Sequence, residues 1–334
     1  MAYDQASFLA GVAVGRNLKS YPSLMRNRAE SIFAFTVGAG STEQWQFDFT
    51  LDFWGEIFWG DGSSEVIDPP AFGYSNLVTL SHVYQGAMTY RIMLIGTINN
   101  LGNPFGLGGG GPKTKVISID TPYPLLRGMG SAANSPRDAD AFLCVAMTKL
   151  ERVASGLLSN WATPGVYESG NSIFTNCPTL EQIPAGLFDR IEYGHIPGTI
   201  ARERLYQSFQ NCSSLQIIPH GLLDNPSLSI VKEMQSIFSG CTGITQIPHG
   251  LLDQMTGLEL VAGAFRNMGL TDIPPDLFDH CPNITGFQYT FADNAGITGN
   301  LPDLWTQYPN ADGTGCFRGC TNAANYGSVP NAWK

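Results

Sequence analysis

The sequence repeats itself, and this repeat constrains the fold more than any other feature. Residues 209–224 read FQNCSSLQIIPHGLLD, and residues 238–253 read FSGCTGITQIPHGLLD. The phenylalanines that open successive copies are Phe174, Phe209, Phe238, Phe265, Phe291 and Phe317, at steps of 35, 29, 27, 26 and 26 residues. A unit of about 26 residues cannot enclose a core alone, so the copies must stack, and the repeat predicts a solenoid.

Each part of the repeat has a predicted role. The Leu-x-x-Ile-Pro piece is expected to be a short strand or an extended edge that ends at proline, which has no N–H to donate. The glycine that follows permits a turn, and the next two apolar residues pack inward. Cysteine is the small inward-facing position; Met268 and Asn294 replace it in two copies, so thiol chemistry is not required there. A weaker first copy runs from Cys144 to Leu158.

This pattern resembles the leucine-rich repeats of the BspA type, which occur in bacterial surface proteins and phage tail proteins. The resemblance covers residues 140–334. We assign 113–334 to the solenoid, with about seven copies, because KTKVISID (113–120) is expected to form a strand that leads into it. The resemblance implies adhesion and recognition without catalysis.

A second signature precedes the repeats. Asp61-Gly62 is a tight-turn dipeptide between strand-like runs, and TYRIMLI (89–95) is rich in β-forming residues. The segment resembles the PKD-type, immunoglobulin-like β-sandwich through Trp59, Gly60, Asp61, Gly62, His82, Tyr84, Gly86 and Tyr90. We assign residues 29–112 to this sandwich, with a Gly-rich loop at 101–112. The expected fold class is mainly β with short helices: a PKD-like sandwich followed by a leucine-rich-repeat solenoid.

Residues 1–28 carry a net charge of +3, which leaves −13 for the remainder of a chain whose net charge is −10. A short helix is expected over residues 4–19, and its opening resembles small virion and tail proteins of prophage clusters. We interpret 1–28 as a virion-anchoring arm that contacts other virion proteins; alternatively, the helix folds back on its own sandwich. The candidate anchoring residues are Phe8, Val12, Arg16, Leu18 and Lys19.

Composition excludes several classes of function. An acidic chain with a pI of about 4.9 and no basic patch is a poor nucleic-acid binder. No apolar run reaches the length of a membrane span, and the opening residues lack the features of a signal peptide. Four of the seven cysteines share one repeat position, which favours packing over a disulfide framework.

The sequence contains none of the common catalytic motifs, so no catalytic residue, metal or cofactor is predicted. His220 and His249 share a repeat position and could bind a metal, but Ala185 and Pro275 hold that position elsewhere, which favours exposed turn residues. The repeated aspartates Asp189, Asp224, Asp253 and Asp279 are interpreted as turn caps. Asp61 alone does not make a calcium site, and the Cys316–Cys320 pair lacks the partners of a zinc site.

Insertions between copies fall on one side of a solenoid, which is often the binding side. Here the insertions are residues 160–170, 190–204 and 225–233. The candidate partner-binding residues in them are Trp161, Tyr167, Tyr193 and His195. Local packing of each loop on its own coil is an equally good interpretation.

Three functions fit this arrangement to different degrees. The first is a non-enzymatic bacteriophage virion protein, in a tail fibre, a tail tip or the capsid surface, that is assembled in the host cytoplasm and binds a host-surface protein or glycan. The second is a bacterial cell-surface adhesin. The third, a polysaccharide-degrading enzyme, is disfavoured because the aspartates recur as scaffolding does. A homo-oligomer is compatible with a tail fibre, although the sequence has no coiled-coil heptads.

Overall fold

The computed structural model describes nine stretches of the chain. They are residues 31–39, 44–67, 77–84, 87–101, 112–122, 144–157, 172–184, 186–189 and 204–334. Within these stretches the chain is mainly β with little helix, as the sequence predicts. The helical elements are η2 (Pro112–Lys115), η3 (Pro226–Ile230), α2 (Leu304–Gln307), η4 (Tyr326–Ser328) and η5 (Asn331–Trp333).

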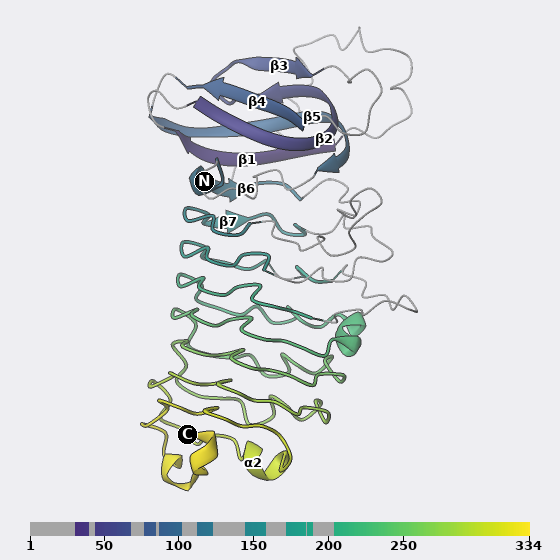
Figure 1. The fold of residues 1–334 in the computed structure, drawn as a ribbon. Helices are drawn as coiled ribbons and strands as arrows, with labels where there is room; N and C mark the ends of the chain where they lie inside the picture. The colour runs from purple at the N-terminus through teal and green to yellow at the C-terminus, as the bar shows by residue number, and fades with distance from the viewer. Residues whose placement is uncertain are drawn as a thin grey trace. The chain divides into compact units, whose positions relative to one another are not determined.

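Seven strands of the described residues join into one sheet (Figure 1). They are β1 (Ser31–Ala39), β2 (Gln44–Phe58), β3 (Ser64–Ile67), β4 (Leu77–Val83), β5 (Met88–Leu101), β6 (Val116–Ile119) and β7 (Arg152–Val153). The order is β3-β2-β5-β1-β6-β7, and β4 pairs with the first half of β2. Every pair is antiparallel except β6–β7, which is parallel.

Two local predictions for the sheet are confirmed. The Asp61-Gly62 turn connects β2 to β3, and Gly60 and Gly62 have φ values of 87° and 94°, a left-handed backbone that glycine adopts without strain. TYRIMLI lies within β5, where Tyr90, Ile92 and Leu94 are buried at a spacing of two residues. This spacing places the three side chains on one face of the strand.

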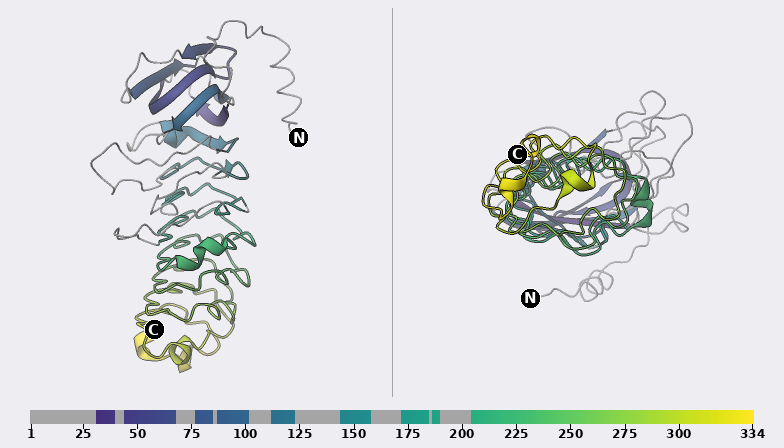
Figure 2. Two further views of the ribbon diagram at one scale, coloured as in Figure 1. Left: turned by 90° about the vertical axis from the view of Figure 1, so that its right-hand side faces the viewer. Right: turned by 90° about the horizontal axis from the view of Figure 1, so that it is seen from below.

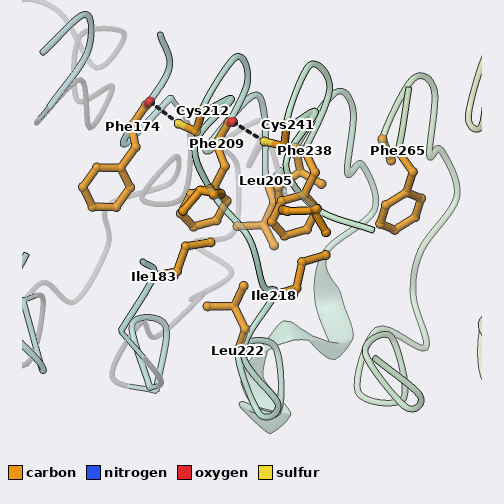
Figure 3. Packing of buried hydrophobic residues seen from close by; sticks show 14 of the residues in the cluster. Phe174, Ile183, Leu205, Phe209, Cys212, Ile218, Leu222, Phe238, Cys241 and Phe265 are labelled. Carbon is orange, nitrogen blue, oxygen red and sulfur yellow. Dashed lines mark hydrogen bonds between the residues drawn. The ribbon is translucent and has the colours of Figure 1, made fainter. Parts of the chain in front are cut away.

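The repeats form stacked coils. In the end-on view the coils of residues 204–334 follow one common closed path, and η3 (green) lies on its outside (Figure 2). The six repeat phenylalanines are fully buried and lie in one column, with neighbouring ring centroids 5.3 to 6.2 Å apart and planes within 16° of parallel. Figure 3 shows four of these rings, with Ile183, Ile218 and Leu222 packed in the same interior.

Backbone hydrogen bonds run from coil to coil beside this column. In each coil from that of Phe174 to that of Phe291, the phenylalanine and the residues two before and two after it donate their N–H groups to carbonyls of the next coil. In the coil of Phe209 these bonds join Gln207 to Gln235 (3.0 Å), Phe209 to Ile237 (2.9 Å) and Asn211 to Ser239 (2.8 Å). We call the surface of residues 204–318 that follows these bonds the ladder face; parallel bridges join its coils through Arg204, Glu233, Leu260, Gly286 and Asp312.

Of the two forms predicted for Leu-x-x-Ile-Pro, a short strand or an extended edge, the strand forms only in the first copy. There Arg152 and Val153 form β7, but the corresponding residues 215–219 and 244–248 are not strands. The bridges fall before the phenylalanine instead, because Pro219 and Pro248 remove N–H groups that a ladder on this side would need.

The turn after the proline is built on glycine in three of the copies. Gly186, Gly221 and Gly250 have φ values of 72° to 79°, and the Asp189 carboxylate would lie only 2.6 Å from a Cβ at Gly186. The aspartate closes the turn through its backbone, since the N–H of Asp189 donates to the Gly186 carbonyl. The predicted glycine turn is therefore confirmed in these copies. In the copy of Phe265, Asp276 replaces the glycine, and the N–H of Asp279 still donates to the Asp276 carbonyl.

Strand β6 joins the sheet to the first coil. Its residues Ser118 and Ile119 pair with β1 on one side and with Arg152 and Val153 of β7 on the other. At its end, the Asp120 carboxylate accepts hydrogen bonds from Thr36 (2.8 Å), Ser118 (2.6 Å) and Arg91 (3.0 Å). The buried apolar residues consequently form one continuous cluster from Phe33 to Trp333.

Candidate functional site

The residues that the sequence analysis proposed for binding lie outside the described residues. They are the loop residues Trp161, Tyr167, Tyr193 and His195, and the arm residues Phe8, Val12, Arg16, Leu18 and Lys19. The third insertion, 225–233, is described. Asn225 accepts a hydrogen bond from the Ser227 N–H (3.0 Å) and donates through its amide nitrogen to the Phe188 carbonyl (2.8 Å), so this loop packs on its own stack.

The signature residues of the sheet meet in one cluster. The His82 ring stacks on Trp59 at 4.7 Å, the Tyr84 ring stacks on Tyr90 at 3.9 Å, and His82 meets Tyr84 edge-on. The Tyr84 hydroxyl donates to the Trp59 carbonyl at 2.7 Å, and burial raises the pKa of this hydroxyl. Because Tyr84 is fully buried, these contacts hold β4 and β5 against the end of β2, and the cluster has a structural role.

Asp61 connects this aromatic cluster to the turn between β2 and β3. Its carboxylate accepts hydrogen bonds from the Ser63 N–H (3.0 Å) and hydroxyl (2.6 Å), and it contacts His82 Nε2 at 2.7 Å. Burial alone would raise the pKa of Asp61, but these bonds outweigh it and lower the pKa to about 2. Asp61 therefore holds the turn and orients His82.

The repeated cysteine position is a hydrogen-bond donor as well as a small apolar group. The thiols of Cys212 and Cys241 donate to the carbonyls of Phe174 and Phe209 at 3.0 Å (Figure 3). Asn294 does the same with its amide nitrogen, which lies 2.8 Å from the Phe265 carbonyl. The donor role explains why Asn294 can replace cysteine, whereas Met268 has no side-chain hydrogen to donate and fills the position as an apolar group.

All seven cysteines are buried with free thiols. Burial raises the pKa of Cys241 and of Cys281 to about 12, and that of Cys320 to about 11. A thiol with such a pKa is protonated at neutral pH, when it donates a hydrogen bond and is a poor nucleophile. The cysteines therefore belong to the scaffold.

Histidines and aspartates of neighbouring coils pair with one another at the turns that follow the repeat prolines. His249 Nδ1 lies 2.8 Å from Asp276, and His280 Nδ1 lies 3.1 Å from Asp253. The hydrogen bond with His249 holds the pKa of Asp276 below its usual value. The His249 side chain is 73% exposed, which confirms the interpretation of His249 as an exposed turn residue.

The ladder face gathers the basic side chains of the coils. Within residues 204–334 every arginine and lysine except Lys334 lies on or beside this face and pairs with a carboxylate of a neighbouring coil. The pairs are Arg204–Glu233 (2.8 Å), Lys232–Glu259 (3.1 Å), Arg266–Asp293 (3.0 Å) and Arg318–Asp293 (3.0 Å). Exposed pairs of this kind contribute little to stability, so their value here is to fix side-chain positions.

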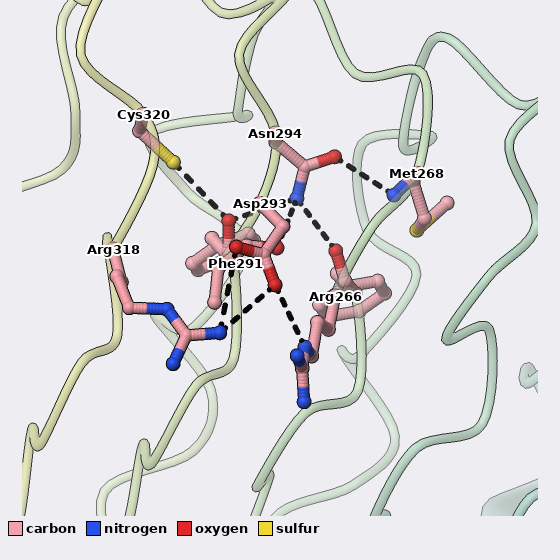
Figure 4. Close-up of polar contacts among 9 residues, drawn as sticks. Arg266, Met268, Phe291, Asp293, Asn294, Arg318 and Cys320 are labelled. Carbon is pink, nitrogen blue, oxygen red and sulfur yellow. Dashed lines mark hydrogen bonds and ion pairs between the residues drawn. The ribbon is translucent and has the colours of Figure 1, made fainter.

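One group on the ladder face combines charge with an exposed ring. Asp293 lies between Arg266 and Arg318 and accepts from both guanidinium groups (Figure 4). Partial burial would raise the pKa of Asp293, but the two arginines outweigh it and hold the pKa below its usual value. The guanidinium carbons of Arg266 and Arg318 lie 5.8 and 5.0 Å from the centroid of the Tyr289 ring, which is 37% exposed. We call these four residues the Tyr289 cluster.

Sequence reasoning did not single out the Tyr289 cluster, although a signal for it was present. Tyr289 occupies the position two residues before the repeat phenylalanine, where other coils have serine, glutamine or glycine. The sequence points to positions where the copies differ, but the candidate residues chosen from it lie in the insertions and do not include Tyr289.

Comparison with known proteins found no match for this chain, either among protein-family models or among curated proteins. In the part of the chain that the structure describes, no helix is long and apolar enough to cross a membrane. The same residues contain no group of three or more His, Cys, Asp or Glu side chains placed to hold a metal ion.

Proposed function

We propose that the protein is a non-enzymatic bacteriophage virion protein that displays a repeat domain for recognition of the host surface. In this proposal, residues 113–334 form a leucine-rich-repeat solenoid of the BspA type and residues 29–112 a PKD-like sandwich. The arm of residues 1–28 anchors the chain to other virion proteins in a tail fibre, a tail tip or the capsid surface.

The observation that carries the proposal is the division of each coil into an invariant interior and a variable face. The phenylalanine column recurs from coil to coil, and so does the donor position except at Met268, while the ladder face changes from Arg204 and Tyr206 at one end to Tyr289 and Arg318 at the other. A rigid scaffold that holds a row of differing exposed side chains is suited to recognition.

Particles purified after lysis of the bacterium that carries the gene would test the proposal. We expect the full chain to co-purify with phage particles, as detected by mass spectrometry and by immunogold labelling. A chain lacking residues 1–28 should be absent from them, and a chain that keeps these residues but lacks Lys334 serves as the control. Recovery of the full chain in the cell-wall fraction instead of in particles would support the cell-surface adhesin and overturn the proposal.

A further inference from the structure

Tyr289 is held in a backbone conformation that bulky side chains rarely adopt. Its φ is 56°, in the left-handed region. The residues at the same position of the other coils are Ser172, Gln207, Ser236, Gly263 and Gly315. A bulky residue at such a position is strained, and residues held under strain concentrate at functional sites.

The stack does not depend on this ring. Ser236 and Gly263 make the same coil-to-coil bond as Tyr289: their N–H groups donate at 3.0 and 2.8 Å, and the Tyr289 N–H donates at 3.0 Å. The ring itself lies outside the core, against the Gly315 backbone of the next coil, where a Cβ would come within 2.7 Å of it. The fold therefore does not explain why a tyrosine stands at this position.

The side chains around the Tyr289 ring include both hydrogen-bond donors and hydrogen-bond acceptors. Arg266 contacts Asp293 through Nε and Arg318 contacts it through Nη2, so each guanidinium uses only part of its five N–H donors. Asp312 accepts from Gln288, the neighbour of Tyr289 in the chain, at 2.8 Å. Arg266, Arg318 and Asp293 together carry a formal charge of +1, and the Asp293 carboxylate contacts both guanidinium groups.

This chemistry selects among classes of ligand. A protein interface has an apolar centre, but the exposed large apolar side chains among residues 204–334 are Ile217 and Tyr289, and Ile217 lies in the Leu-x-x-Ile segment, away from the ladder face. An anionic ligand would have to compete with Asp293, whose carboxylate already contacts both guanidinium groups and leaves the cluster an excess of only one positive charge. A sugar ring has an apolar C–H face that suits an aromatic ring, and hydroxyls that both donate and accept.

We propose that Tyr289, Arg266, Asp293 and Arg318 form a subsite for an uncharged sugar residue of a surface polysaccharide. The inference rests on the proposed function and deepens it by naming the chemistry of the receptor and the face that binds it. Tyr289 stacks on the sugar ring, and the three charged side chains contact its hydroxyls.

A glycan array probed with the purified full chain tests the subsite. We expect retention on neutral oligosaccharides, followed by titration calorimetry with the best-bound one. Tyr289→Ser, which installs the residue of Ser236, should weaken binding about 10-fold, and Tyr289→Phe, which keeps the ring, should restore it. Ile217→Ser is the matched control, because it removes the other exposed large apolar side chain of residues 204–334, which lies in the Leu-x-x-Ile segment, and should leave binding unchanged.

The outcomes separate the subsite from the proposed function. Retention on acidic glycans alone, on no glycan, or equally by wild type and a folded Tyr289→Ser variant would overturn the subsite. A chain that joins phage particles but binds no neutral glycan removes the subsite and leaves the proposed function. A chain that binds such a glycan through Tyr289 but never joins phage particles would support the subsite and overturn the proposed function.

Discussion

The sheet and the coil stack both bury aromatic rings, but they hold them in opposite ways. In the sheet, Trp59, His82, Tyr84 and Tyr90 are different residues, and each contact among them occurs once. In the stack, one residue type makes the same ring contact five times. The sheet cluster therefore depends on particular hydrogen bonds and the stack on register.

The largest expected effect comes from breaking the column in its middle. Phe238→Ala removes a fully buried ring that stacks on Phe209 at 5.3 Å and on Phe265 at 6.2 Å. The free energy of unfolding in urea should fall by about 3–5 kcal/mol, since the cavity cannot close without disturbing two neighbouring coils. Phe238→Leu, which keeps most of the volume, should cost less; equal losses for the two variants would contradict the account.

The next test compares hydrogen bonds inside the stack. Asn294→Ala removes bonds to the carbonyls of Phe265 and Phe291, and leaves the buried Met268 N–H without the acceptor that it contacts at 3.0 Å. We expect a loss of about 2–3 kcal/mol in the free energy of unfolding.

Two further variants sharpen the Asn294 test. Asn294→Cys should recover part of the loss, because cysteine fills this position in other coils, as at Cys212. Asn283→Ala, which removes one exposed bond to the Thr256 carbonyl, should cost less than about 0.5 kcal/mol. Equal losses in the variants at positions 294 and 283 would mean that the donor position does not matter.

A smaller loss of stability is expected when the hydrogen bond of the aromatic cluster in the sheet is removed. Tyr84→Phe removes the buried hydroxyl that donates to the Trp59 carbonyl and should lower the free energy of unfolding by about 1–2 kcal/mol. Tyr308→Phe is the matched variant in the stack, where the hydroxyl lies near the carbonyls of Phe278 and Cys281. A similar loss in both would show that the two regions differ in ring packing and not in their single hydrogen bonds.

The smallest effect is a dependence on pH. The pKa of Asp61 is about 2 in the folded protein, below its ordinary value of 3.8, so the charged carboxylate stabilises the fold above pH 4. This contribution is lost as the pH falls from about 4 to 2. The difference in unfolding free energy between wild type and Asp61→Asn should shrink over that range, by at most about 1 kcal/mol because Asp61 is partly exposed. A difference that stays constant would show that the carboxylate is not held by Ser63 and His82.

How much could be predicted from the sequence depends on how local each feature is. The repeat register, the glycine turns and the Asp61-Gly62 turn follow from residues close together in the chain. The bridges before the phenylalanine and the donor role of Asn294 depend on contacts between residues 26 or more positions apart, which a single copy does not reveal. The candidate residues at 161–195 and in the arm remain predictions.

The Tyr289 cluster was missed for a related reason. The sequence shows that Tyr289 differs from its counterparts, but it does not show that Arg266 and Arg318 of the adjacent coils reach the same ring. Knowledge of the coil-to-coil register is needed to bring positions before and after the phenylalanine together. Once that register is known, the neighbours of each exposed side chain follow by counting along the copies.

The coil-to-coil backbone bonds also bear on how a chain of this kind can change over generations. Each coil from that of Phe174 to that of Phe291 donates the same three N–H groups to the next coil, although the repeats differ in length. In the 29-residue repeat of Phe209, the residues of η3 lie outside the common path (Figure 2). Duplication or deletion of one whole coil would leave every remaining donor facing a carbonyl. The length of the stack can therefore vary in whole coils, while exposed positions such as Tyr289 diversify independently of one another.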